Sequence, residues 1–129
     1  MTDDETAAGG AAATDGGVKT DEDVVEHRKL IITGTGIAAL SAAIYAARSN
    51  NDPLLFEGDE PGGQLTLTTE VENYPGFSEG ISGPDLINEM KDQAGRFGAD
   101  FEHGIVESVD DSAGHFRVEL SNGDVYTAD

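Results

Sequence analysis

The stretch of sequence that decides the fold is residues 30–57, which read LIITGTGIAALSAAIYAARSNNDPLLFE. Leu30 to Ile32 form a short apolar run, which is typical of a strand buried on both faces in a parallel sheet. A helical period follows, and its apolar stripe consists of Ile37, Leu40, Ile44 and Ala47. Leu54 to Phe56 form a second apolar run. A strand, a glycine turn, a helix and a second strand within about thirty residues predict a βαβ unit.

The turn between the first strand and the helix reads Gly34-Thr35-Gly36-Ile37-Ala38-Ala39, a match to the pattern G-x-G-x-x-G/A. Gly34 permits a tight turn, and Gly36 has no side chain to block a pyrophosphate. The N–H groups at the start of the helix then face the anion, aided by the helix dipole. Glu57 ends the second strand, 21 residues after Gly36, where a carboxylate accepts hydrogen bonds from ribose hydroxyls and disfavours the 2′-phosphate of NADP. This unit predicts a dinucleotide site and leaves both FAD and NAD open.

The rest of the chain predicts a loop, a helix and a set of short strands. Residues 58–83 are rich in Gly, Pro and Thr, too long for a plain connection, and are predicted to be functional. A second helix is predicted to start with Pro84 in its first turn and to stop at Gly98. Strands are expected at 100–103, 105–109, 115–120 and 125–127, the last two joined at Asn122-Gly123. The expected fold class is α/β, a Rossmann-like βαβ unit with a parallel sheet plus a small antiparallel strand set.

Composition and charge narrow the function. The 129 residues carry a formal net charge of −19, with seven Lys and Arg residues and no cysteine. Zero cysteines exclude disulfides, thiolate metal sites and thiol redox chemistry within this chain. So few basic residues argue against nucleic acid as a partner. No apolar run approaches the ~18 residues of a transmembrane helix, so no membrane partner is expected. The dispersed carboxylates suit concentrated salt, and we interpret the protein as salt-adapted.

The first 26 residues differ from the remainder. They hold eight acidic residues and one lysine, without any apolar period. Such a composition buries too little apolar surface to offset the entropy of ordering, so residues 1–26 are predicted to be a disordered acidic tail and 27–129 the folded domain. A docking arm is the alternative interpretation of this tail. It has neither the basic start nor the apolar core of a signal peptide, which favours a cytoplasmic location.

Several polar residues are not assigned a chemical role. His27, His103 and His115 lack metal-ligand spacing, so no metal site is predicted. Glu70 and Glu72 share one face of an alternating stretch and are expected to meet solvent. No local pattern suggests a Ser–His–Asp arrangement, and no catalytic residue is predicted.

The middle segment carries the most specific motifs. Gly62-Gly63-Gln64-Leu65-Thr66, followed by EVENYPGF at 70–77, closely resembles the low-molecular-weight thioredoxin reductase family. The stretches 42–48 and 93–99 are similar to that family as well. The resemblance runs from about Lys29 to Asp129 and therefore covers nearly all of the predicted folded part.

The resemblance implies FAD in the first dinucleotide site. The turn would hold the FAD pyrophosphate, and Glu57 the adenosine ribose. Asn73 would lie near the flavin ring, and Val106 would touch the adenine through its backbone. Paired glycines and amide side chains suit such a cofactor, because backbone N–H groups can approach it and amides can bond its polar atoms. The cofactor-binding residues so predicted are Gly34, Thr35, Gly36, Ile37, Ala38, Ala39, Glu57, Gly58, Gly62, Gly63, Gln64, Leu65, Asn73 and Val106.

Departures from the family bear on activity. The family has a Cys-x-x-Cys dithiol in a separate NADPH domain and a second FAD-binding segment, and this sequence has none of them. Ile37 stands where a proline is common. We therefore expect the N-terminal FAD segment of a longer reductase, in which NADPH reduces FAD and the flavin reduces a dithiol that serves thioredoxin, with a homodimer as one arrangement.

Three alternatives stay open. The first is a non-catalytic remnant that binds a nucleotide weakly or not at all. The second is a simple NAD-binding module, which Glu57 allows but the segment from Gly62 to Phe77 does not favour. The third is a flavoprotein that passes electrons to ferredoxin.

Overall fold

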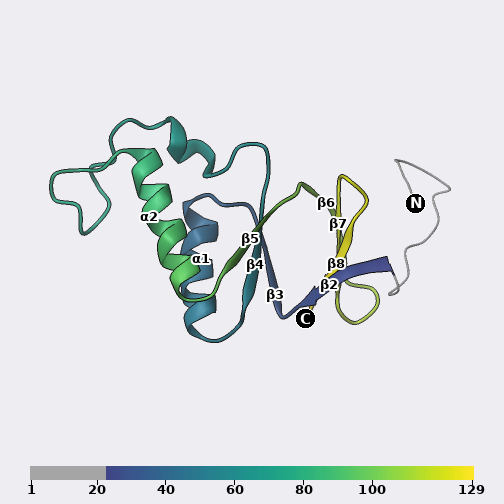
Figure 1. The fold of residues 1–129 in the computed structure, drawn as a ribbon. Helices are drawn as coiled ribbons and strands as arrows, with labels where there is room; N and C mark the ends of the chain where they lie inside the picture. Colours follow the sequence, from purple (N-terminus) through teal and green to yellow (C-terminus); the bar gives the residue numbers. More distant parts are fainter. Residues whose placement is uncertain (1–22) are drawn as a thin grey trace. The chain divides into compact units, whose positions relative to one another are not determined.

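The structure is a computed structural model and describes residues 23–129. The described residues form two compact units, one of residues 32–103 and one of residues 23–31 with 104–129. The predicted tail, 1–26, falls almost wholly outside the described residues. The elements shown in Figure 1 are β2 (Val24–Arg28), β3 (Leu30–Thr33), α1 (Ile37–Arg48), β4 (Pro53–Glu57), the 3-10 helix η2 (Gly63–Leu67), α2 (Gly83–Arg96), β5 (Asp100–His103), β6 (Val106–Asp110), β7 (Phe116–Leu120) and β8 (Val125–Ala128).

The first unit is built on a three-stranded sheet in the order β3-β4-β5. β4 and β5 run parallel, with Leu55 opposite Phe101. Helices α1 and α2 lie on the same face of this sheet (Figure 1). Successive strand–helix–strand crossovers of one hand place their helices on one face, so the arrangement follows from the chain order. The predicted βαβ unit is confirmed.

The core of this unit lies between the two helices and the sheet. Alanines make α1 narrow, which lets it approach its neighbours closely, and α1 buries Leu40, Ala43 and Ala47. The predicted stripe is therefore right at Leu40 and Ala47, whereas Ile37 and Ile44 are partly buried and pack at the rim of the core. The buried residues contributed by α2 and β4 are Leu86, Ile87, Met90, Ala94 and Leu55.

The prediction of strands buried on both faces holds for one strand and fails for the other. In β4, Pro53 to Phe56 are buried. In β3, Leu30 to Ile32 keep intermediate exposure. β3 forms an edge of the three-stranded sheet in the described part of the chain, and an edge strand is covered less than a central one. An apolar run by itself does not distinguish the two positions.

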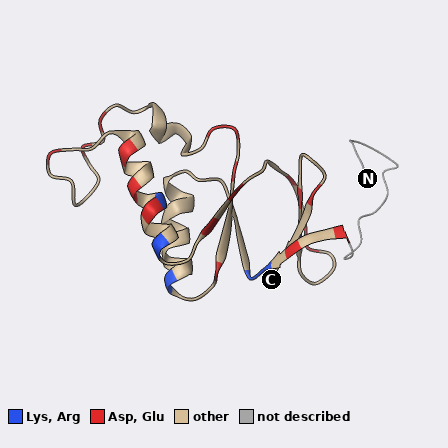
Figure 2. Cartoon of the chain, viewed as in Figure 1, with Lys and Arg blue, Asp and Glu red and all other residues tan. Residues whose placement is uncertain are grey.

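Helix α2 begins and ends at the signals present in its sequence. The Ser82 hydroxyl caps it by accepting a hydrogen bond from the Asp85 N–H at 3.1 Å. Pro84 lies in the first turn, as predicted. Gly98 follows the helix with φ +109°, a left-handed conformation that glycine adopts without strain. Figure 2 shows basic residues, in blue, in the C-terminal half of α2, where their charge complements the helix dipole.

The second unit contains a four-stranded sheet in the order β2-β8-β7-β6. β6, β7 and β8 are antiparallel neighbours, which confirms the predicted antiparallel set. The Asn122-Gly123 hairpin is also confirmed, with the Asn122 Oδ1 accepting from the Asp124 N–H at 2.9 Å. Asp110 ends β6, and the hydrogen bond from the Ser112 N–H in the following turn lowers the pKa of the Asp110 carboxyl.

Strand β2 was not predicted, and it changes the boundary expected at residue 26. Val24 to Glu26, assigned above to the tail, are part of β2, which pairs in parallel with β8. His27 joins the two strands, because its Nδ1 lies 2.6 Å from the Thr127 Oγ1 and its Nε2 lies 2.7 Å from the Asp129 Oδ1. The backbone hydrogen bonds of β2 are made with a strand about one hundred residues away in the chain. No local sequence pattern predicts such a pairing.

The described helices are all short. Across residues 23–129, no helix is both long enough and apolar enough to cross a membrane.

Candidate functional site

The glycine turn between β3 and α1 leaves open space where a ligand could lie. Gly34 has φ +101°, and its N–H donates to the Phe56 carbonyl at 2.8 Å, which ties the turn to the end of β4. Gly36 is the N-cap residue of α1, and no side chain caps this helix end. A Cβ added at Gly34 or Gly36 would meet nothing within 4 Å. The first N–H groups of α1 have no partner within the helix, so they are available to an anion.

A second pair of glycines lies against this turn. Gly62 and Gly63 have φ values of +85° and +67°. The Gly62 N–H donates to the Thr35 Oγ1 at 3.0 Å, and Thr35 is buried at 3% exposure. A Cβ added at Gly63 would lie 3.7 Å from the Cα of Gly36. Two glycine-rich loops that are 26 residues apart in the chain thus meet at the start of α1.

The loop that carries Gly62 and Gly63 is held in place by its own hydrogen bonds. The Thr66 hydroxyl donates to the Gly63 carbonyl at 2.7 Å, and the Gly83 N–H donates to the Thr68 carbonyl at 2.8 Å. At Gly83 the contact is so close that an added Cβ would lie 1.7 Å from the Leu65 carbonyl oxygen. The part of the segment around η2 is therefore packed against the start of α2. The functional role predicted for the segment from its length stays a prediction.

Glu57 ends β4 beside the turn and has a basic partner. Lys91, in α2, donates from its Nζ to the Glu57 Oε2 at 2.5 Å. Both side chains are partly buried, at 19% exposure for Glu57 and 30% for Lys91. Sequence reasoning missed Lys91. One signal was present, because Lys91 is the sole lysine after Lys29 in a strongly acidic chain.

Four other predicted site residues, Gln64, Leu65, Asn73 and Val106, lie outside the glycine turn. Gln64 is exposed at the start of η2, and Leu65 is partly buried within it. Asn73 is exposed and lines a shallow hollow of about 450 Å³ along residues 72–78. Val106 begins β6, in the other unit. The roles given to these residues remain predictions.

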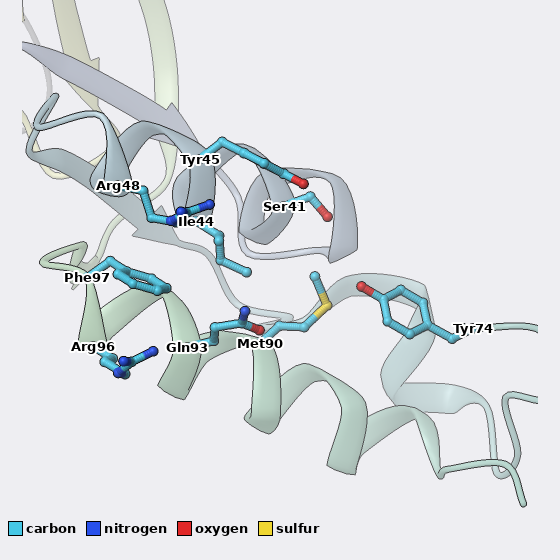
Figure 3. Close-up of a pocket in the computed structure, with 9 residues that line it drawn as sticks. All are labelled: Ser41, Ile44, Tyr45, Arg48, Tyr74, Met90, Gln93, Arg96 and Phe97. Atoms are coloured by element: carbon cyan, nitrogen blue, oxygen red, sulfur yellow. The ribbon is translucent and has the colours of Figure 1, made fainter. Parts of the chain in front are cut away.

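A separate cleft opens between the two helices. It has a volume of about 460 Å³, and none of the predicted cofactor-binding residues lines it. Figure 3 shows Phe97 at one end of this cleft, with Arg48 and Arg96 to either side. Their guanidinium carbons lie 5.6 Å and 4.9 Å from the Phe97 ring centroid, in cation–π contact. The remaining lining residues are Ser41, Ile44, Tyr45, Tyr74, Met90 and Gln93.

The histidines and acidic pairs show no further site. No group of three His, Cys, Asp or Glu side chains suited to a metal ion gathers within residues 23–129. Glu70 and Glu72 are exposed, as expected, on either side of the buried Val71. The His27 and His115 rings contact edge to face, with centroids 6.4 Å apart, and this contact belongs to the packing of the second unit.

The arrangement around the turn can bind a phosphate-containing ligand. It combines a helix start without a side-chain cap, two glycine loops in contact, and a carboxylate at the end of the next strand. Backbone N–H groups in such loops form a concave site for anions. A carboxylate at the neighbouring strand end suits the hydroxyls of a ribose. The turn therefore offers N–H donors suited to phosphate groups and a carboxylate suited to ribose hydroxyls, two kinds of group that a nucleotide carries.

Residues 28–129 match the family model described as pyridine nucleotide-disulphide oxidoreductase. The chain belongs to this family. Among its relatives, the thioredoxin reductase of Rickettsia typhi is 50% identical over 101 residues, which are 78% of this chain and 33% of that protein. The chain thus spans about a third of the length of the curated relatives it matches.

Solved structures of the family agree. The thioredoxin reductase of Lactococcus lactis matches with a TM-score of 0.72 and 35% identity, over 78% of this chain and 33% of that one. A ferredoxin-flavin thioredoxin reductase from Clostridium acetobutylicum matches with a TM-score of 0.67 and 28% identity, over 80% of this chain and 35% of that one. The predicted resemblance to thioredoxin reductases and the α/β fold class are confirmed.

Proposed function

We propose that this chain is the FAD-binding portion of a thioredoxin-reductase-type flavoprotein. The observation that carries the proposal is the contact between the two glycine loops, in which Gly63 lies against Gly36 and Gly62 bonds to Thr35. A dinucleotide needs backbone that it can approach closely at its pyrophosphate, and the turn at Gly34 and Gly36 leaves that space open. The similarity to thioredoxin reductases supports FAD over NAD as the ligand.

The residues present fit FAD. The turn from Gly34 to Ala39 would hold the pyrophosphate with the N–H groups that begin α1. Glu57 would accept hydrogen bonds from the adenosine ribose. The segment 62–65, with Asn73, would follow the cofactor toward its flavin, and Val106 would meet the adenine. Bound FAD would supply redox chemistry that no side chain of this chain can provide.

The complete reaction needs parts that this chain does not contain. We infer from the similarity to thioredoxin reductases that NADPH is the electron source. Because the chain has no cysteine, the dithiol that passes electrons to thioredoxin would be carried elsewhere. No catalytic residue is assigned within the chain, and turnover by the chain alone is not expected. The relatives' names support thioredoxin as the partner, whereas a homodimer and a cytoplasmic location stay predictions from the sequence.

A flavoprotein that passes electrons to ferredoxin in place of a disulfide is the second candidate. The Clostridium acetobutylicum structure, a ferredoxin-flavin thioredoxin reductase, supports it only in that a ferredoxin-linked protein has this fold. The gene beyond the codon for Asp129 distinguishes the two. A second glycine-turn domain with a Cys-x-x-Cys motif supports the NADPH type. An otherwise full-length flavoprotein gene without that Cys-x-x-Cys motif supports the ferredoxin type.

The test of FAD binding is a titration of the purified chain in molar salt. Flavin absorbance and fluorescence follow binding, and far-ultraviolet circular dichroism reports the fold. We expect saturable binding of FAD by a folded chain, with weaker binding of NAD. A folded chain that ignores FAD contradicts the proposal, and tighter binding of NAD than of FAD favours the simple NAD-binding module.

A further inference from the structure

The pair formed by Lys91 and Glu57 joins two elements that the chain separates by 34 residues. Its Nζ–Oε2 distance is 2.5 Å, and the partial burial of both side chains distinguishes it from a solvated surface pair. An exposed ion pair contributes little to the free energy of folding. A partly buried, charge-assisted hydrogen bond is stronger and less screened by salt. The pair therefore restricts the Glu57 carboxylate to one orientation.

The ammonium group of Lys91 is itself held from a second side. Its Nζ lies 5.2 Å from the centroid of the Phe101 ring, a cation–π contact with strand β5. One turn away along α2, Ile87 and Ala94 are buried, so Lys91 lies at the edge of the buried face of the helix. The side chain thus reaches from α2 to the last residue of β4 and to Phe101 in β5.

The pair leaves part of the carboxylate available. Oε2 accepts from Lys91, and within residues 23–129 no further hydrogen bond to the Glu57 carboxylate is found. A carboxylate has about four acceptor positions, so Oε1 can still accept from a hydroxyl group. The pair is also neutral overall, which lowers the repulsion that an isolated carboxylate would exert on a nearby phosphate.

We propose that Lys91 is a positioning residue that orients the Glu57 carboxylate toward the adenosine ribose. The carboxylate in turn masks the positive charge of Lys91. The inference rests on the proposed dinucleotide site. It assigns two consequences to Lys91. With Glu57 present, the site favours a free ribose diol, since the ammonium is already engaged. Without the Glu57 charge, Lys91 becomes an available cation and the site gains affinity for a ribose that carries a 2′-phosphate.

The test compares two probes, ADP and adenosine 2′,5′-bisphosphate, by calorimetric titration of the full chain at one fixed salt concentration. In Lys91→Met we expect ADP affinity to fall about tenfold, and in Lys91→Arg most of it to be kept. In Glu57→Gln we expect the ratio of bisphosphate to ADP affinity to rise about tenfold. In the double variant Glu57→Gln with Lys91→Met that rise disappears, because its source is the freed ammonium.

The matched control is Arg96→Met. It removes one positive charge from the same helix, and Arg96 also contacts an aromatic ring, that of Phe97, but is not paired with Glu57. Both probe affinities should stay within about twofold of the unmodified chain in this variant. Circular dichroism verifies that each variant is folded.

Three results overturn the inference. A folded Lys91→Met chain with unchanged ADP affinity removes the positioning role. If the ratio of bisphosphate to ADP affinity does not rise in Glu57→Gln, or rises equally in the double variant, Lys91 is not a masked cation. If Lys91→Met does not fold, the ratio measured in Glu57→Gln decides the inference. A native chain that binds neither probe nor FAD refutes the proposed function, and the inference with it.

Discussion

At the scale of single residues, the glycines of this chain have different physical roles. Gly36 has an ordinary extended conformation, with φ −71° and ψ 179°, and open space before it. Gly83 has no space at all for a side chain. Gly95, on an exposed turn of α2, has neither a positive φ nor a close neighbour. Substitution should therefore weaken binding at Gly36, lower stability at Gly83 and do neither at Gly95.

Gly36→Leu should abolish ligand binding while keeping the fold. Its backbone conformation suits any residue, and the new side chain would fill the open space where the pyrophosphate is expected. FAD titration should show affinity reduced more than about tenfold, with an unchanged circular dichroism spectrum. Gly95→Ala is the control and should bind as the native chain does. Native-like binding by Gly36→Leu would contradict the site.

Gly83→Ala should destabilise the chain. The added Cβ would lie 1.7 Å from the Leu65 carbonyl oxygen and 2.7 Å from that of Thr68, and both are backbone atoms that cannot move independently. We expect a loss of about 1–3 kcal/mol or more in the free energy of unfolding, measured in urea. Gly95→Ala should instead stabilise by about 0.5–1 kcal/mol, because alanine is the better helix former. Equal stability of the two variants would show that the loop shifts freely.

At the scale of elements, the site depends on how one loop is fastened to another. The start of α1 and the loop before η2 are joined by the buried bond from the Gly62 N–H to the Thr35 hydroxyl. β4 supplies Glu57 at its end, and α2 supplies the lysine that holds it.

Thr35→Val should loosen the junction between the two loops. It removes the acceptor of a buried N–H while keeping the shape of the side chain, which costs about 1–3 kcal/mol of stability. Hydrogen exchange of the Gly62 amide should accelerate by more than the overall loss of stability explains. Thr35→Ser keeps the hydroxyl and is expected to retain slow exchange. Unchanged exchange in Thr35→Val would mean that the bond is not needed.

At the scale of the whole molecule, charge is the dominant feature. The chain carries −19 formal charges and seven basic residues. Figure 2 shows acidic residues, in red, dispersed over the loops, α2 and the strands of the described part. Such a distribution repels itself in the compact state, and the repulsion weakens as the screening length falls to about 3 Å at 1 M salt.

The melting temperature should consequently rise with salt. Between 0.1 M and 2 M KCl we expect the melting temperature to increase by several degrees. For a domain of this size that corresponds to roughly 1 kcal/mol in the free energy of unfolding. Sucrose at equal osmolality is the control, because it strengthens burial without screening charge. A melting temperature that is flat in KCl, or that rises equally in sucrose, would contradict the salt-adapted interpretation.

The features predictable from the sequence were those with a local signature. The patterns involved, which are apolar runs, a 3.6-residue period and glycine pairs, each extend over a few neighbouring residues. They therefore predicted β4, both helices and the Asn122-Gly123 hairpin. The glycine turn was recognisable because its residues are consecutive. The boundary at residue 26 failed, since β2 depends on a partner strand at the other end of the chain.

The sequence by itself therefore determined the βαβ unit, the glycine turn and the family resemblance. The tertiary structure alone decided that Gly63 lies against Gly36, that Lys91 holds Glu57, and that β3 is an edge strand. The physical reason is separation along the chain. Local conformational preferences act between near neighbours, whereas these contacts join residues tens of positions apart and form only when helices and strands pack together.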